Sequence, residues 1–193
     1  MASTELSIGT RRLAPAGDRV RSAIACTTAL IAVTAIATIA GTFDHALAPS
    51  APPHPTLHPT LAAAASILAN NARVLALPYG LVILRFDTVR WGRTLGSALL
   101  VGVLGANAVT VGLALGRWHG RLVPYLPPLP LEWAAAGLAA SVWARALATG
   151  RRDHGHLAPA ADWRGPAAAA AITLALLAGA AGAEVLLTPH AAA

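Results

Sequence analysis

Five long apolar segments, nearly free of charged residues, constrain this chain more than any other feature. A helix needs about 20 residues to cross a ~30 Å hydrocarbon core, and each segment is close to that length. Only 11% of all residues are charged, against about 25% in soluble domains. We therefore predict an all-α, polytopic membrane helix bundle with five transmembrane helices. The predicted spans are residues 22–41, 61–84, 94–116, 131–149 and 166–187.

The arginines indicate how such a bundle is oriented. All 14 basic residues are arginines, and ten of them fall in stretches that alternate topology places on one side. Cytoplasmic loops carry an excess of basic residues, so the pattern predicts a multi-pass protein of the cell membrane with a cytoplasmic N-terminus and an external C-terminus. The ten are Arg11, Arg12, Arg19, Arg21, Arg85, Arg90, Arg93, Arg151, Arg152 and Arg164. Arg117 and Arg121 fall on the opposite side, and Arg73 and Arg145 lie within spans.

These arginines occur in short runs between apolar segments, whereas nucleic-acid binding needs a basic patch on one face. We expect the lipid bilayer as a partner and no nucleic acid. We divide the chain into a basic cytoplasmic segment, residues 1–21, and a membrane domain, residues 22–189. A second interpretation of the beginning stays open. The early arginines followed by Ala46-Leu47-Ala48 resemble a signal peptide with a cleavage site, although the apolar stretch exceeds the usual 7–15 residues.

Tryptophans and small residues refine the expected packing. Trp91 and Trp163 flank inner span ends and Trp118 and Trp133 flank outer ones, as an aromatic belt predicts. Trp143 lies deeper, which indicates either helix packing or lipid contact. Small residues four positions apart let helix backbones approach closely. Such pairs are Gly92/Gly96, Gly112/Gly116, Gly137/Ser141 and Gly179/Ala183.

Polar residues inside the spans are the candidate site. Polar groups at membrane depth are costly, usually have partners and often mark function. We expect Arg73, near the middle of its span, to pair with Glu184 or with Glu132, Glu184 being favoured. Two roles remain open for the cluster: a polar network that fixes helix packing, or a functional site. Its members are Asn70, Asn71, Arg73, Asn107, Glu132 and Glu184.

Catalytic chemistry has no evident residues in this sequence. We find no nucleophile with a base and an acid, no phosphate-binding loop and no closed set of metal ligands, so we expect a non-enzymatic protein without a cofactor. Five histidines fall on the predicted outer side, where a solvated loop and a metal site are both open interpretations. They are His45, His54, His58, His119 and His190.

From about Ser66 onward the chain resembles the stage II sporulation protein M family of bacterial five-helix membrane proteins. The family often has a Pro-His-Gly turn before its glutamate, whereas this chain has Pro124-Tyr125-Leu126-Pro127. The matching motifs are Asn70-Asn71-Ala72-Arg73-Val74, Asn107 with Gly112, Leu129-Pro130-Leu131-Glu132-Trp133-Ala134-Ala135, and Ala183-Glu184-Val185-Leu186-Leu187-Thr188-Pro189.

The resemblance implies a membrane scaffold. In endospore formers the family member works with membrane-anchored cell-wall hydrolases during engulfment, and relatives also occur in organisms that do not sporulate. By this resemblance we expect a non-enzymatic scaffold for other membrane or cell-envelope proteins, or for copies of itself. The alternative is a permease-like subunit of a small-solute or ion transporter, with the polar cluster lining the route.

Overall fold

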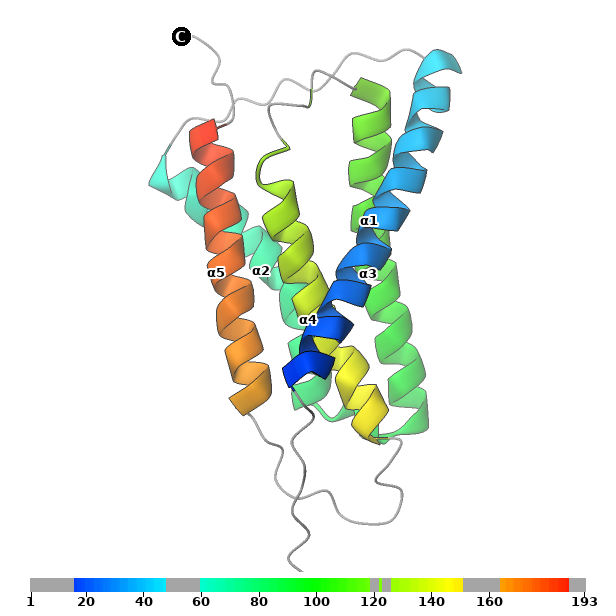
Figure 1. The fold of residues 1–193 in the computed structure, drawn as a ribbon, viewed down its shortest axis with the longest axis vertical. Helices are drawn as coiled ribbons and strands as arrows, with labels where there is room; N and C mark the ends of the chain where they lie inside the picture. The colour runs from blue at the N-terminus through cyan, green and yellow to red at the C-terminus, as the bar shows by residue number, and fades with distance from the viewer. Residues whose placement is uncertain (1–15, 48–59, 119–121, 123–125, 151–163, 188–193) are drawn as a thin grey trace, which may run out of the picture.

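The chain forms a bundle of long α-helices (Figure 1). The computed structural model describes residues 16–47, 60–118, 122, 126–150 and 164–187. Successive helices run in alternate directions along the long axis of the bundle (Figure 1). Within the described residues every regular element is helical, which confirms the predicted all-α class. The elements are α1 (Ala16–Leu47), α2 (Leu61–Ile83), the short 3-10 helix η1 (Phe86–Thr88), α3 (Arg90–Trp118), α4 (Leu129–Gly150) and α5 (Arg164–Leu187).

Four of the helices are long and apolar enough to cross a membrane: Gly17–Asp44 within α1, Leu61–Ile83, Arg90–Trp118 and Gly165–Leu187 within α5. These four correspond to predicted spans, and α1 and α3 extend beyond the predicted limits at both ends. Helices of this length and composition are typical of multi-pass integral membrane proteins. The prediction of five spans is thus supported for four helices, and α4 is the exception.

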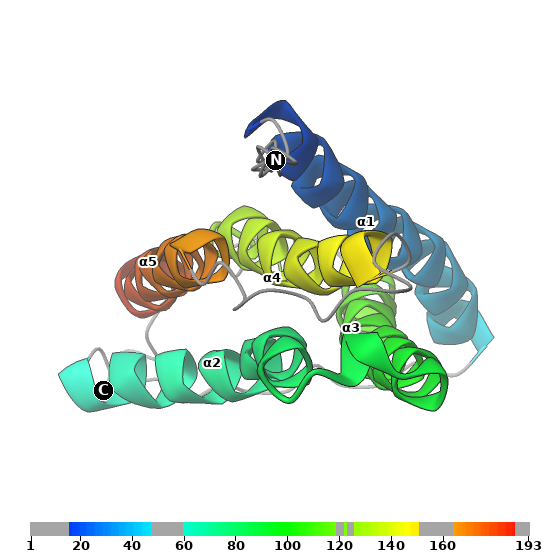
Figure 2. The same ribbon diagram turned by 90° about the horizontal axis from the view of Figure 1, so that it is seen from below.

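Helix α4 lies at the centre of the bundle, and alanines make up much of its buried surface. It packs against α1, α2 and α5, and more weakly against α3. Seen from below, α4 and α5 lie between α1 on one side and α2 with α3 on the other (Figure 2). A helix enclosed by other helices needs small side chains that let them approach, not bulky ones for lipid. Its buried alanines are Ala135, Ala136, Ala139 and Ala140.

Close approach of backbones is clearest between α1 and α3. A Cβ atom added at Gly112 would collide with the carbonyl oxygen of Thr34, and one at Gly116 with that of Thr38. The predicted close packing at this glycine pair is confirmed, as it is at Gly96, which lies against the Trp143 ring. At Gly179 a Cβ would meet only a Leu131 methyl group at 3.5 Å, so no close approach occurs there.

The tryptophans follow the prediction only in part. Trp91 is 64% exposed near the start of α3, as a residue of an aromatic belt would be. Trp143 is 2% exposed and donates from Nε1 to the Ser97 hydroxyl at 3.2 Å, so helix packing is the correct alternative. The prediction that Trp133 belongs to an aromatic belt is wrong, because neighbouring helices cover its side chain, which is 5% exposed. Trp163 lies outside the described residues.

Charged side chains divide between the two ends of the bundle. We call the end where α2 and α4 begin the upper end, as in Figure 1, and the end that carries η1 the lower end. Among the described residues, Arg117 forms an ion pair with Asp44 near the upper ends of α3 and α1. Glu132 and Glu184 also lie towards the upper end. The other described arginines, apart from Arg73, are at or near the lower end: Arg19, Arg21, Arg85, Arg90, Arg93, Arg145 and Arg164.

Helices α2 and α3 form a hairpin that opens upward. Arg85 takes a left-handed backbone conformation (φ 58°) directly after α2, and this turn leads into η1. From this joint α2 runs obliquely away from α3, so the two separate towards the upper end (Figure 1). The direct contact between α2 and α3 is therefore limited, and α4 packs across the space between them.

Candidate functional site

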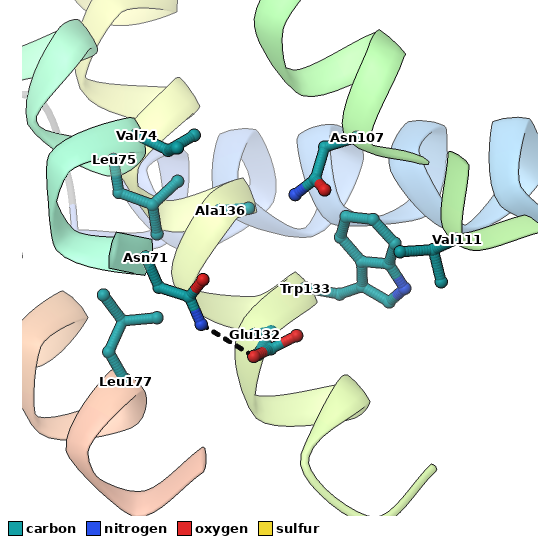
Figure 3. A pocket seen from close by; sticks show the side chains of 9 residues that line it. All are labelled: Asn71, Val74, Leu75, Asn107, Val111, Glu132, Trp133, Ala136 and Leu177. Atoms are coloured by element: carbon teal, nitrogen blue, oxygen red, sulfur yellow. Dashed lines mark hydrogen bonds between the residues drawn. The ribbon is translucent and has the colours of Figure 1, made fainter. Parts of the chain in front are cut away.

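A small pocket lies between α2, α3, α4 and α5, towards the upper end of the bundle (Figure 3). Its volume is about 80 Å³, which corresponds to two or three water molecules at ~30 Å³ each. It is partly open to the outside. Three of the six predicted site residues line it, among apolar side chains. The lining consists of Asn71, Val74, Leu75, Asn107, Val111, Glu132, Trp133, Ala136 and Leu177.

One hydrogen bond links two of the predicted residues. The Asn71 side-chain amide on α2 donates from Nδ2 to Glu132 Oε1 on α4 at 2.8 Å (Figure 3). Glu132 occupies the first turn of α4, and Asn71 lies in the upper half of α2. Both side chains are half-buried. The bond therefore joins the oblique helix to the central one at the pocket wall.

The remaining polar atoms of the lining include both acceptors and donors, since each amide carries an oxygen and an NH2 group. Asn71 donates one N–H to Glu132, and the Asn71 carbonyl oxygen remains available as an acceptor. The second oxygen of Glu132 lies on the side nearer Trp133, and the Asn107 amide lies across the pocket from Glu132 (Figure 3). Within the described part of the chain, the Glu132 carboxylate accepts a hydrogen bond from Asn71 alone, and the Asn107 side chain forms none. Glu132 is thus the one charged side chain of the lining, and the two amides beside it offer both oxygens and N–H groups.

Glu184 lies close to this pocket without lining it. It is half-buried on α5 and near enough to Glu132 for the two carboxylates to repel each other. No cation among the described residues forms an ion pair with either carboxylate. The two glutamates, whose proximity the sequence left undetermined, therefore make this part of the bundle electronegative.

Asn70 and Arg73 are not brought into the group. Both are exposed on the outer face of α2, whereas Asn71 and Leu75 turn inward. Successive side chains of an α-helix point about 100° apart, because it has 3.6 residues per turn, so Asn71 can face the bundle while Asn70 and Arg73 face away from it. The predicted ion pair of Arg73 with Glu184 or Glu132 is wrong: the described ion pair involves other residues, Arg117 and Asp44.

Sequence reasoning missed the apolar walls, although helical spacing contains the signal. Leu75 follows Asn71 by four positions, and Val111 follows Asn107 by four, so each pair shares one helix face. Trp133 was assigned to the membrane interface because it lies at a span end. The adjacent Glu132, a polar residue expected in the site, indicates the position of Trp133 better, since both side chains line the pocket.

Comparison with known proteins assigns the chain to no family. No protein-family model, no curated protein and no solved structure matches the chain. The resemblance to the stage II sporulation protein M family therefore stays a prediction.

The chemistry of the pocket is that of binding. A half-buried carboxylate, two amides and an indole are groups able to contact a small polar or cationic group, and apolar residues form the rest of the wall. The described residues contain no group of three or more side chains suited to hold a metal ion. Of the five outer histidines, four lie outside the described residues, and the structure describes only the backbone of His45, at the end of α1.

Proposed function

We propose that the chain is a cell-membrane protein with five spans, a cytoplasmic N-terminus and an external C-terminus. The alternating helix directions and the arginines near the lower end support this orientation (Figure 1). Helix α4 serves as the fifth span because the surrounding helices shield its polar residues from lipid. Reporter fusions after Leu57 and after Pro159 test the topology. An export-dependent reporter is expected to be active after Leu57 and silent after Pro159, and activity after Pro159 contradicts the model.

We further propose that the protein is a non-enzymatic scaffold that holds a membrane or cell-envelope partner, or a second copy of itself. The outer face of α2 carries this proposal. Three exposed polar residues, Ser66, Asn70 and Arg73, follow one another along it, and we call them the α2 polar face. Between Leu61 and Ile83 at its ends, α2 exposes no large apolar side chain.

The contrast with α3 supports a protein contact at this face. Helix α3 exposes a series of valines and leucines along its length, with Val101 72% exposed. Around the α2 polar face the exposed neighbours are alanines such as Ala69 and Ala76. Small and polar residues favour helix–helix contact in membranes. A charge at the centre of a span costs about 2.5–3.5 kcal/mol in lipid, so a partner that covers Arg73 is stabilising.

The permease-like alternative receives less support. A transport route needs polar groups across the whole bundle, but below the pocket the space between α2, α3 and α4 is filled by a continuous apolar cluster. Leu81, Leu100 and Trp143 belong to that cluster. The stage II sporulation protein M resemblance also favours a scaffold.

Cysteine cross-linking in native membranes tests the scaffold. In a Cys26→Ala background, Ala76→Cys places a thiol beside the α2 polar face and Val101→Cys places one on the apolar face of α3. We expect a discrete cross-linked species from Ala76→Cys alone, lost when Arg73→Leu is added. Equal cross-linking at both positions, or a species that persists with Arg73→Leu, contradicts the proposal.

A further inference from the structure

The pocket has a chemistry that neither scaffold contacts nor helix packing explains. Its polar lining offers one carboxylate and two amide groups, and only the Asn71–Glu132 hydrogen bond joins them. A pair that served packing alone would be enclosed, whereas this carboxylate borders a space of about 80 Å³ that is partly open. A cationic occupant that donates hydrogen bonds would balance the Glu132 carboxylate, for which no cation partner lies among the described residues.

An alkylammonium group has both properties. It carries one positive charge and three N–H donors, and the available acceptors are Glu132 Oε2, Asn71 Oδ1 and Asn107 Oδ1. The Trp133 indole adds an aromatic surface of the kind that attracts cations. The negative potential of Glu184 acts in the same direction. A divalent metal ion is a poorer match, because Ca²⁺ takes six to eight oxygen ligands and Mg²⁺ six.

The position of the pocket indicates where the ammonium comes from. Glu132 lies in the first turn of α4, within about 5 Å of the helix start. In the proposed topology α4 enters the bilayer from the outer side at this turn, which places Glu132 near the lipid headgroups. Val103 and Leu99, four and eight positions before Asn107, continue the α3 wall as an exposed apolar surface. A lipid can lay its chains on this surface while its headgroup enters the pocket.

We infer that this pocket binds the ammonium headgroup of an aminophospholipid such as phosphatidylethanolamine, with Glu132 as the counter-charge and Asn71 and Asn107 as hydrogen-bond acceptors. The inference rests on the proposed membrane location but not on the scaffold role. It assigns a lipid ligand to the three polar residues that line the pocket.

Native mass spectrometry of the full-length, detergent-purified protein tests the site. The protein is equilibrated with equal amounts of phosphatidylethanolamine and phosphatidylglycerol, and the lipids retained at low collision energy are counted. We expect at least fivefold more phosphatidylethanolamine than phosphatidylglycerol on the wild-type protein. Glu132→Gln keeps an oxygen that accepts from Asn71 but removes the charge, and is expected to abolish this preference. Asn107→Asp adds a second carboxylate and is expected to increase it.

The matched control is Asn70→Ala, because Asn70 adjoins Asn71 but is exposed outside the pocket. It is expected to retain the wild-type preference, and thermal unfolding in phosphatidylglycerol alone verifies that all variants are folded. Equal retention of the two lipids by the wild-type protein, or an unchanged preference in Glu132→Gln, overturns the inference. Stabilisation by free ethanolamine without retention of the lipid overturns the lipid source. Extraction of the protein from membranes by alkaline carbonate would instead contradict the membrane location, so the two failures are distinguishable.

Discussion

Asn71 and Glu132, 61 positions apart in the chain, form a 2.8 Å hydrogen bond that joins α2 to the central helix α4. In the proposed topology both residues lie in spans or at their ends, where polar groups need partners. Interhelical hydrogen bonds in membrane proteins are nevertheless modest, averaging about 0.6 kcal/mol. The bond thus fixes the direction of the Glu132 side chain more than it stabilises the bundle.

A double-mutant cycle measures this contact. Asn71→Ala and Glu132→Ala are each expected to destabilise the protein, with a coupling free energy of about 0.6 kcal/mol and at most ~1.7 kcal/mol. Glu132→Gln is expected to preserve the coupling because its amide oxygen still accepts from Asn71. Reversible unfolding in mixed detergent micelles gives the free energies. A coupling indistinguishable from zero would show that the bond contributes nothing to stability.

The α1–α3 interface predicts a strong position effect for one small substitution. Gly112→Ala places a methyl group against the Thr34 carbonyl, and the resulting backbone shift is expected to cost about 1–3 kcal/mol. Gly102→Ala is the control on the same helix, because nothing lies within 4 Å of its added Cβ. That variant is expected to be neutral or to stabilise by up to about 1 kcal/mol, since alanine is the better helix former. Similar unfolding free energies for the two variants contradict the close approach.

Trp143 is the large side chain on which the lower half of the bundle depends. Trp143→Ala is expected to destabilise by about 3–5 kcal/mol, because the ring is buried against Gly96 and Leu81 and its N–H is bonded to Ser97. Trp91→Ala removes the same side chain from an exposed position, where its ring meets Phe86 edge to face, and is expected to cost about 0.5–1.5 kcal/mol. Equal losses for the two tryptophans rule out this account of the core.

The ion pair between Arg117 and Asp44 is expected to contribute little. Both side chains are more than a third exposed, and exposed pairs are worth about 0.2–1 kcal/mol. Asp44→Asn is therefore expected to destabilise by less than about 1 kcal/mol. The effect should shrink as salt is raised, because the Debye length falls from about 10 Å at 0.1 M to 3 Å at 1 M. A larger loss that is independent of salt contradicts a solvent-screened pair.

The helices were predictable because each apolar segment carries its own signal. Residues 61–84 and 166–187 match α2 and α5 almost to the residue. The rotation of α2 about its axis was not predictable in the same way. Its inward residues, such as Leu75, and its outward alanines are all compatible with an apolar segment, so hydropathy does not indicate which side faces the bundle. For that reason Asn70 and Arg73 were grouped with Asn71 although they point elsewhere.

Partners across the bundle depend on which helices are neighbours, and composition does not determine this. The bond from Tyr79 to Thr173 and the ion pair from Arg117 to Asp44 each join helices distant in the chain. Depth alone correctly placed Asn71, Asn107 and Glu132 at one level. The pocket between them exists because α2 leaves α3 obliquely, and no residue pattern in α2 predicts that angle.

The arrangement of α1 has a consequence for how the protein is made. Its close contacts are with α3 and α4, and none of comparable extent is made with α2, the next helix in the chain. Chains are synthesised from the N-terminus at about 5–20 residues per second. Gly112 and Gly116, which receive the α1 backbone, are therefore added several seconds after α1 itself is complete. Throughout that interval α1 has no native neighbour to dock against. A chaperone or insertase that shelters the isolated helix therefore has to act until α3 is synthesised.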